Sequence, residues 1–264
     1  MKNTSNNCSC IAFYSAEKHV IDYEKLYLLF LTIASELGCV ITHAGVVGEA
    51  YSNKVAPIKK MNKQLELKNY QNIDSMSIYS QIDEGKNYDN WQFYASVMSS
   101  PASHGCELVL CIDKRFNLFE SDLIINLINL IKKLFWIDYG IGYKRSYELG
   151  PIYYASGVIQ GIERNSVEAN KISSWFKAML ITSDFNFNLL RDVYEFNFLS
   201  RRQLDAKISY NNSMNFNSTL NLEQWIIKNK FGLLSQIDSN LWLWQIENNI
   251  EYIAELLSKN NLLI

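Results

Sequence analysis

Hydrophobic positions along this chain alternate between the spacing of amphipathic helices and the spacing of β-strands. Apolar residues three and four positions apart predict helices over residues 22–37, 121–135, 168–179, 222–230 and 250–257. Asp22 is a suitable N-cap for the first of these helices, and Gly38 is a suitable stop. Ser200 and Gln203 have the spacing of a capping box, which predicts a further short helix to about residue 207.

Short runs rich in β-branched and aromatic residues predict the strands. They cover residues 11–15, 39–47, 75–81, 91–98, 106–112, 189–198, 233–237 and 241–246, and an Asn-rich polar loop is expected over 211–221. Trp242 and Trp244 alternate with Leu241 and Leu243, so both faces of that strand are apolar. This pattern is typical of a central strand that is covered on both sides.

The order of these elements predicts an α+β protein. We expect mostly antiparallel sheet packed with amphipathic helices, with duplicated ferredoxin-like β-α-β units as one arrangement. No repeat, Pro/Gly-rich linker or change of composition separates domains. We therefore expect a single α+β domain over residues 1–264, with two lobes (about 1–161 and 162–264) as the alternative.

Residues 139–161 combine five glycines with five tyrosines. Glycine and proline disfavour a helix here, and a G-x-G-x-x-G phosphate loop is excluded because Arg145 occupies the position of the third glycine. We expect two strands joined by a loop over residues 145–151. Tyr147 and Glu148 would lie at the tip of this loop, which is then a candidate contact surface.

Composition and charge narrow the range of functions. The 264 residues are 48% hydrophobic and 20% charged, which is typical of a compact globular protein, and the net charge is −2. A field of this sign does not attract nucleic acid or an anionic membrane. Lysines between Lys54 and Lys68 form a basic stretch, interpreted as a solvated face with a nucleic-acid patch as the alternative. Residues 74–90 are acidic.

No set of residues in this sequence defines a reaction. Cys106 and His104 have the chemistry of a nucleophile and its base, but Cys106 begins an apolar strand, where a buried thiol is common. Cys8 and Cys10 are spaced more tightly than the usual zinc pair, and no second pair follows. The adjacent carboxylates of Asp83 and Glu84 would diverge in a loop. We therefore expect no enzyme activity, no metal and no cofactor.

The cysteine count and the N-terminal residues indicate the cellular compartment of the protein. Five cysteines are an odd number, which favours reduced thiols over a disulfide framework. The first ten residues contain no apolar leader, and no apolar helix candidate reaches about 18 residues. We expect a cytoplasmic protein that makes no membrane contact.

One C-terminal motif resembles a known family. The run LRDVYEFNFLSRRQL over 190–204 is followed by Trp225 and by SNLWLWQI before a final helix. Within this run, the matching positions are Asn197, Phe198, Leu199, Ser200 and Leu204. This pattern resembles the bacterial type VI immunity proteins, which are encoded beside polymorphic toxins. The resemblance implies a cytosolic protein that sequesters a cognate toxin and has no catalytic residues.

The residues that would contact the toxin are sought among exposed charges and aromatics, because Tyr, Trp and Arg dominate interface energetics. The candidates are Asp83, Glu84, Asp89, Arg145, Tyr147 and Glu148. The acidic segment would suit a basic, nuclease-type toxin, since opposite charges speed association. The alternative functions are an enzyme that uses Cys106 and His104, and a nucleic-acid-binding protein that uses the stretch from Lys54 to Lys68.

Overall fold

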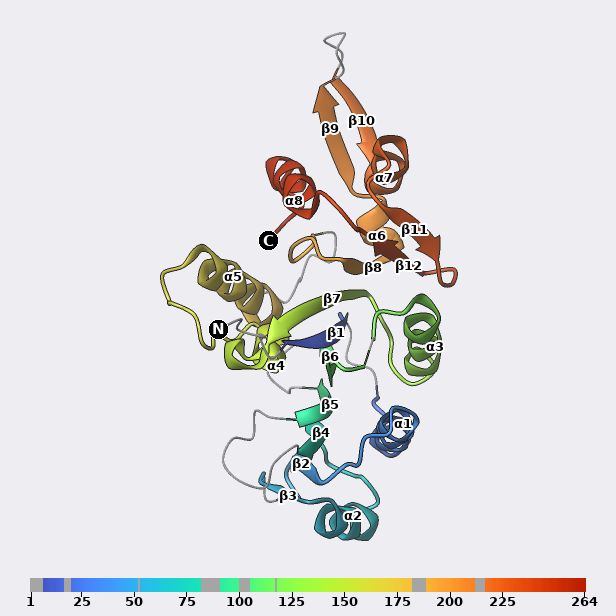
Figure 1. The fold of residues 1–264 in the computed structure, drawn as a ribbon, viewed down its shortest axis with the longest axis vertical. Helices are drawn as coiled ribbons and strands as arrows, with labels where there is room; N and C mark the ends of the chain where they lie inside the picture. Colours follow the sequence, from blue (N-terminus) through green and yellow to red (C-terminus); the bar gives the residue numbers. More distant parts are fainter. Residues whose placement is uncertain are drawn as a thin grey trace.

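The structure is a computed structural model, and it places helices on both faces of one large sheet (Figure 1). It describes residues 7–16, 20–51, 53–81, 91–99, 105–116, 118–181, 189–211 and 217–264. Within these residues there are eight α-helices, a sheet of ten strands and a separate two-stranded hairpin. The prediction of an α+β fold with mostly antiparallel sheet is confirmed.

The bounds of the elements are as follows. The large sheet contains β1 (Asn7–Ser15), β2 (His43–Val47), β3 (Val55–Pro57), β4 (Ser75–Gln81), β5 (Trp91–Ser99), β6 (Cys106–Asp113), β7 (Tyr139–Ser146), β8 (Phe196–Ser200), β11 (Leu233–Gln236) and β12 (Leu241–Gln245). The hairpin pairs β9 (Lys207–Asn211) with β10 (Asn217–Asn221). The helices are α1 (Tyr23–Glu36), α2 (Ile58–Leu67), α3 (Ser121–Ile131), α4 (Pro151–Ala155), α5 (Val167–Ile181), α6 (Arg201–Leu204), α7 (Leu222–Asn229) and α8 (Ile250–Lys259).

The strand order contains a ferredoxin-like unit. The sheet runs β11-β12-β8-β7-β1-β6-β5-β4-β2-β3, and all neighbouring strands are antiparallel. Strands β1, β5, β6 and β7, with α1 and α3 as crossovers, form a βαββαβ unit in which β7 and β6 flank β1. The segment from β2 to β4 is inserted after α1 and extends the sheet.

The C-terminal part repeats this topology in shortened form. Strands β8, β11 and β12 lie in the order β8-β12-β11, which matches β1-β6-β5 of the first unit. The place next to β8, where a fourth strand of this unit would lie, is taken by β7. The two units therefore share one continuous sheet. Whether they behave as one domain or as two lobes stays a prediction.

Two apolar cores lie on opposite faces of the sheet. Helices α1, α2 and α3 pack on one face, and helices α4 to α8 pack on the other. Figure 1 shows α1 to α3 on one side of the sheet and α4 and α5 on the other. Strand β12 contributes to both cores, with Leu243 on the first face and Trp244 on the second, and both side chains are buried. The predicted coverage of this strand on both sides is confirmed.

The glycine- and tyrosine-rich residues 139–161 form one strand rather than two. Strand β7 is present, but the predicted second strand is replaced by a 3₁₀ turn and helix α4. Gly150 has a φ of 57°, which turns the chain so that Pro151 becomes the first helical residue. In β7, a Cβ at Gly142 would lie 2.9 Å from Phe119 and Phe196, so glycine makes room for two packed rings.

Several boundaries differ from the prediction. The strand expected over 189–198 begins only at Phe196, because the side chain of Asn197 bonds both the backbone N–H of Tyr194 (3.0 Å) and its C=O (2.7 Å). These bonds hold a turn in place of a sheet ladder. The short helix after Ser200 ends at Leu204 and carries the predicted capping box. Part of the expected 211–221 loop is strand β10.

Asp22 caps α1 as predicted, since its side chain accepts a hydrogen bond from the backbone of Lys25. The strand expected over 39–47 begins at His43, and the helix expected over 121–135 ends at Ile131. Across the described ranges, no helix combines the length and the apolar composition that a membrane span requires.

Candidate binding groove

Of the residues predicted to contact a partner, the structure describes Arg145, Tyr147 and Glu148. The other three lie outside the described residues: Asp83, Glu84 and Asp89. Glu148 is exposed. Tyr147 is buried, and its hydroxyl donates towards the carbonyl of Trp91 (2.8 Å) and a carboxylate oxygen of Asp113 (3.2 Å). Tyr147 therefore links the 3₁₀ turn to strands β5 and β6 in the interior, and the prediction that it lies at an exposed loop tip is wrong. Arg145, in contrast, belongs to a surface groove.

Of the Cys106–His104 pair considered for an enzyme, the structure describes only the cysteine. Cys106 is buried at the start of β6, and His104 lies outside the described residues. In the part of the chain that the structure describes, no three His, Cys, Asp or Glu side chains are placed to hold a metal ion.

A groove runs along residues 191–195, and its lining includes residues of α5 and of α8. It consists of three adjoining hollows that share lining residues. The first, of about 360 Å³, lies between α5 and this segment, the second, of about 250 Å³, lies towards β7, and the third, of about 670 Å³, lies along α8. Tyr154 and Tyr194 line both the first and the second hollow, while Arg191 and Asp192 line both the first and the third.

The groove segment is fixed at both ends. Leu190 accepts a hydrogen bond from Ile264 and donates one to Leu262, so the chain end after α8 holds it in a short bridge. At the other end, the Asn197 turn leads into β8. The segment therefore presents its side chains from a constrained backbone rather than from a long loop.

Arg191 is the buried centre of the groove. Its guanidinium donates to the carbonyls of Ala155 (3.0 Å) and Tyr154 (2.5 Å), and towards the hydroxyl of Tyr14 (3.3 Å). These carbonyls belong to the last turn of α4, where helix carbonyls have no partner within the helix and where a cation is favoured. The backbone N–H of Arg191 also donates to the Tyr139 hydroxyl (3.1 Å). Arg191 thus joins α4, β1 and β7.

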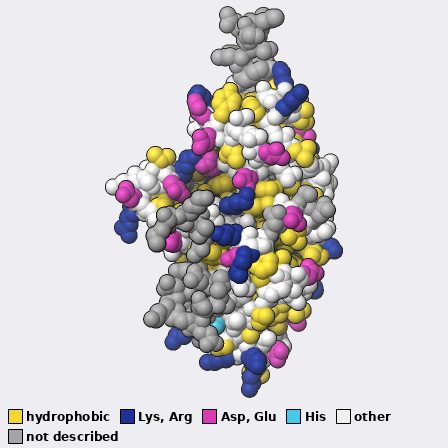
Figure 2. All heavy atoms as spheres, in the orientation of Figure 1, with side chains coloured by type: hydrophobic (Ala, Val, Ile, Leu, Met, Phe, Trp, Pro, Cys, Tyr) yellow, Lys and Arg dark blue, Asp and Glu magenta, His cyan; other side chains and the backbone are white. Residues whose placement is uncertain are grey.

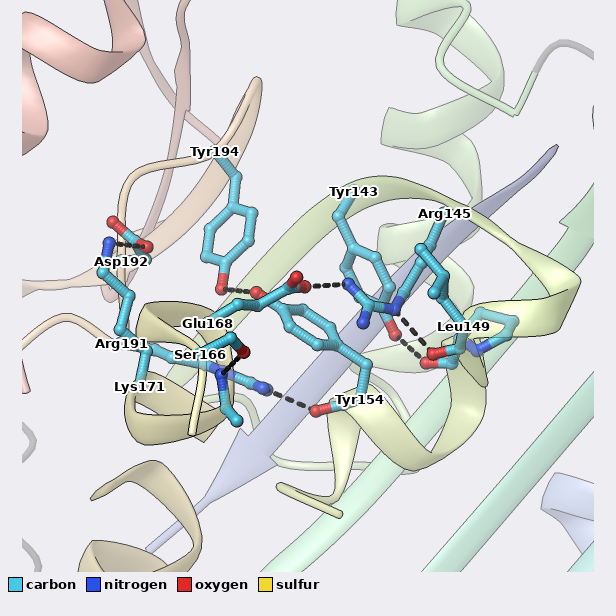
Figure 3. A network of polar contacts seen from close by, with 12 residues as sticks. Tyr143, Arg145, Leu149, Tyr154, Ser166, Glu168, Lys171, Arg191, Asp192 and Tyr194 are labelled. Carbon is cyan, nitrogen blue, oxygen red and sulfur yellow. Dashed lines mark hydrogen bonds and ion pairs between the residues drawn. The ribbon is translucent and has the colours of Figure 1, made fainter. Parts of the chain in front are cut away.

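Tyr154 lies between two arginines (Figure 3). The guanidinium carbons of Arg145 and Arg191 are 4.3 Å and 4.1 Å from the centre of its ring, within the range of cation–π attraction. The Tyr154 hydroxyl is 2.7 Å from that of Tyr194, across the first hollow. Burial raises the pKa of both Tyr143 and Tyr194, so their hydroxyls stay protonated at neutral pH and can donate and accept hydrogen bonds.

Ion pairs border the groove. They join Arg145 to Glu168 (2.5 Å), Lys171 to Asp192 (2.7 Å), Lys144 to Glu195 (2.8 Å) and Lys259 to Glu255 (2.6 Å). Most of these side chains are exposed, so solvent screens the pairs and they add little to stability. Figure 2 likewise shows basic and acidic side chains interspersed across the middle of the molecule. A mixed-charge surface with tyrosines is suited to binding another protein rather than to a single anion.

Beneath the groove lies a buried carboxyl group. Glu107, on β6, is 4% exposed and accepts a hydrogen bond from the Ser156 hydroxyl (2.7 Å), next to the carbonyls that Arg191 binds. Burial raises the pKa of Glu107 to about 7, and this effect outweighs the hydrogen bond from Ser156 and the charge of Arg191. Its second oxygen has no hydrogen-bond partner among the described residues.

Two other surface features are present. A hollow of about 770 Å³ lies where β8, β11 and β12 meet and shares Glu195 with the groove, and Phe119 and Phe196, stacked at 4.4 Å, contribute to its lining. The basic stretch places Lys59, Lys60 and Lys63 on the exposed side of α2, at the lower end of the molecule (Figures 1 and 2).

The groove could not be derived from motif spacing. Arg145, Tyr154 and Arg191 come from β7, α4 and the segment before β8, and tertiary packing alone brings them together. One signal was present, however. Arg191 and Asp192 are the charged residues inside an otherwise apolar and aromatic run, LLRDVY, and a charge in such a run requires a specific partner or an exposed position.

Comparison with known proteins shows a likeness of fold. No protein-family model matches the chain, and no curated protein matches its sequence. The fold is similar to the solved structure of the Pseudomonas aeruginosa T6SS protein PA0821, with a TM-score of 0.52 and 11% sequence identity. The match covers 93% of this chain and 71% of that protein. At this identity the similarity concerns the fold alone.

Proposed function

We propose that this chain is an immunity-type protein that binds and neutralises a cognate protein toxin acting in the cytoplasm. The groove along residues 191–195 is the proposed contact surface. The observation that carries the proposal is the combination of contiguous hollows, a backbone segment hydrogen-bonded at both ends and a lining of tyrosines and paired charges. Such a lining is typical of surfaces that bind proteins, where aromatic and arginine side chains supply most of the affinity.

Two further observations support this proposal. The run from residue 190 to 204 resembles the immunity-protein motif, and it contains both the groove segment and the capping box that follows β8. The similar fold is that of a protein from a type VI secretion system, the setting in which such immunity proteins occur. Inhibition in this mode requires only tight binding that covers the toxin's working surface, with no reaction by the inhibitor.

The first test is rescue of growth. The product of the gene beside this one is expressed in a sensitive bacterium, with and without this chain. We expect growth to stop with the neighbour alone and to resume with both, and we expect the two proteins to co-purify. Continued toxicity in the presence of well-expressed, folded chain would contradict the proposal.

A pair of surface variants tests whether the toxin binds at the groove. Val167 lines the first hollow at the start of α5 and is 76% exposed, while Val40, after α1, is also 76% exposed. Helix α1 covers the opposite face of the sheet from α5. Val167→Asp should weaken toxin binding at least tenfold and Val40→Asp should leave it unchanged. Neither change removes a buried contact, and an acid in the first turn of a helix is tolerated. Equal effects of the two variants would place the contact elsewhere.

A further inference from the structure

The charges around Tyr154 are unbalanced. Four basic side chains and three carboxylates line the first and second hollows. Each carboxylate is paired: Glu168 with Arg145, Asp192 with Lys171 and Glu195 with Lys144. The remaining charge belongs to Arg191, whose guanidinium donates to carbonyl and hydroxyl oxygens. This part of the groove therefore complements a negative group.

Arg145 makes only partial use of its guanidinium. Its side chain is 9% exposed, its Nε donates to the carbonyl of Leu149 (2.8 Å), and its Nη1 donates to Glu168. Its Nη2 is buried and has no hydrogen-bond partner within the described residues. A guanidinium fork can bind both oxygens of one carboxylate, and such paired bonds are stronger than one. Arg145 thus retains an unused donor in a site that already holds a carboxylate by one bond.

Glu168 is the more exposed partner in this pair. Its side chain is 45% exposed, against 9% for Arg145, and it is in the first turn of α5. Moving its carboxylate into solvent restores the hydration that this half-exposed group has only in part within the pair. Arg145 stays in place without it, held by Leu149 and by the ring of Tyr154.

We propose that Glu168 occupies the position of an acidic side chain of the protein partner, and that an Asp or Glu of the partner displaces it and binds Arg145 beside Tyr154 and Tyr194. This inference rests on the proposed function and names the chemistry of the partner at this point. The partner as a whole can still be basic, since one carboxylate suffices.

Glu168→Gln and Glu223→Gln form a matched pair for the test. Both replace the carboxylate of an arginine ion pair with a neutral side chain of the same shape, and Glu223, on α7, pairs with Arg201 (2.6 Å) outside the residues that line the groove. Binding of the product of the neighbouring gene is measured by titration calorimetry for the wild type and both variants. We expect Glu168→Gln to bind about threefold to fivefold more tightly, since the competing ion pair is gone, and Glu223→Gln to change affinity less than twofold.

The outcomes separate the two proposals. If neither the wild type nor Glu168→Gln binds the neighbour, the proposed function fails and the inference fails with it. If the wild type binds and the two variants behave alike, or Glu168→Gln binds more weakly, only the displacement of Glu168 is overturned. Replacing each exposed Asp and Glu of the partner by its amide should identify one residue whose loss weakens binding at least fivefold. If no such residue exists, the inference is also overturned.

Discussion

Glu107 should make the stability of this protein fall as the pH rises from 4.5 to 7. A buried carboxyl with a raised pKa holds its proton more tightly in the folded state than in the unfolded state. Its contribution to stability is therefore complete below its ordinary pKa of 4.5 and is lost as the pH passes through about 7. The increase in the pKa of Glu107 from 4.5 to about 7 corresponds to about 3 kcal/mol in the free energy of unfolding.

The variant Glu107→Gln isolates this effect. Glutamine has the same shape, still accepts the hydrogen bond from Ser156 and carries no titrating proton. We expect the variant to lose the decrease between pH 4.5 and 7, and to be more stable than the wild type at pH 8 by about 1 to 3 kcal/mol. Urea unfolding followed by tryptophan fluorescence at several pH values measures both curves.

Asp113, at the end of the same strand, does not obscure this window. For Asp113, burial works to raise the pKa, but hydrogen bonds from Arg115 outweigh it and leave the pKa below its ordinary value of 3.8. The stability from such a group is present above that value and is lost only as the pH falls below it. A wild-type curve that is flat or rises between pH 4.5 and 7 would refute the role of Glu107, as would an unchanged slope in Glu107→Gln.

Three further predictions concern the fold, and denaturant unfolding measures each. Trp244→Ala should cost about 3 to 5 kcal/mol, because the side chain is fully buried; a loss below about 1 kcal/mol would contradict this burial. Gly142→Val should cost about 1 to 3 kcal/mol, since even its Cβ would lie 2.9 Å from two phenylalanine side chains; a neutral result would show that these rings move freely. Asp22→Ala should cost about 1 kcal/mol, because α1 loses its N-cap, the hydrogen bond from the backbone N–H of Lys25 to the Asp22 side chain; an unchanged stability would mean that this cap is dispensable.

Periodicity predicted most elements of the fold because the determinants are local. The alternation in β12 and the cap at Asp22 each depend on neighbouring residues, and both are confirmed. Helix α4 was missed because its tyrosines favour strands, although Gly150 followed by Pro151 is a helix-start signal. The late start of β8 depends on the side-chain bonds of Asn197, which composition does not reveal.

The groove was harder to anticipate than the fold. The ring of Tyr154 meets Arg191 across a sequence separation of 37 residues, and only the packing of α4 against β1 and β7 brings them together. Arg145 was predicted as a contact residue from its place in a loop, and the structure instead places it in β7 with a largely buried side chain. The acidic candidates at Asp83, Glu84 and Asp89 lie outside the described residues, so their role stays a prediction.

Amide hydrogen exchange on the complex with the neighbouring gene's product tests the central claim most directly. We predict increased protection over residues 167–172, 191–195 and 250–259, which contribute to the lining of the groove. Protection confined to the lysine-bearing helix α2, or to residues 230–233 and 245–249 around the hollow near Phe119, would contradict the assignment of the groove as the toxin-binding surface.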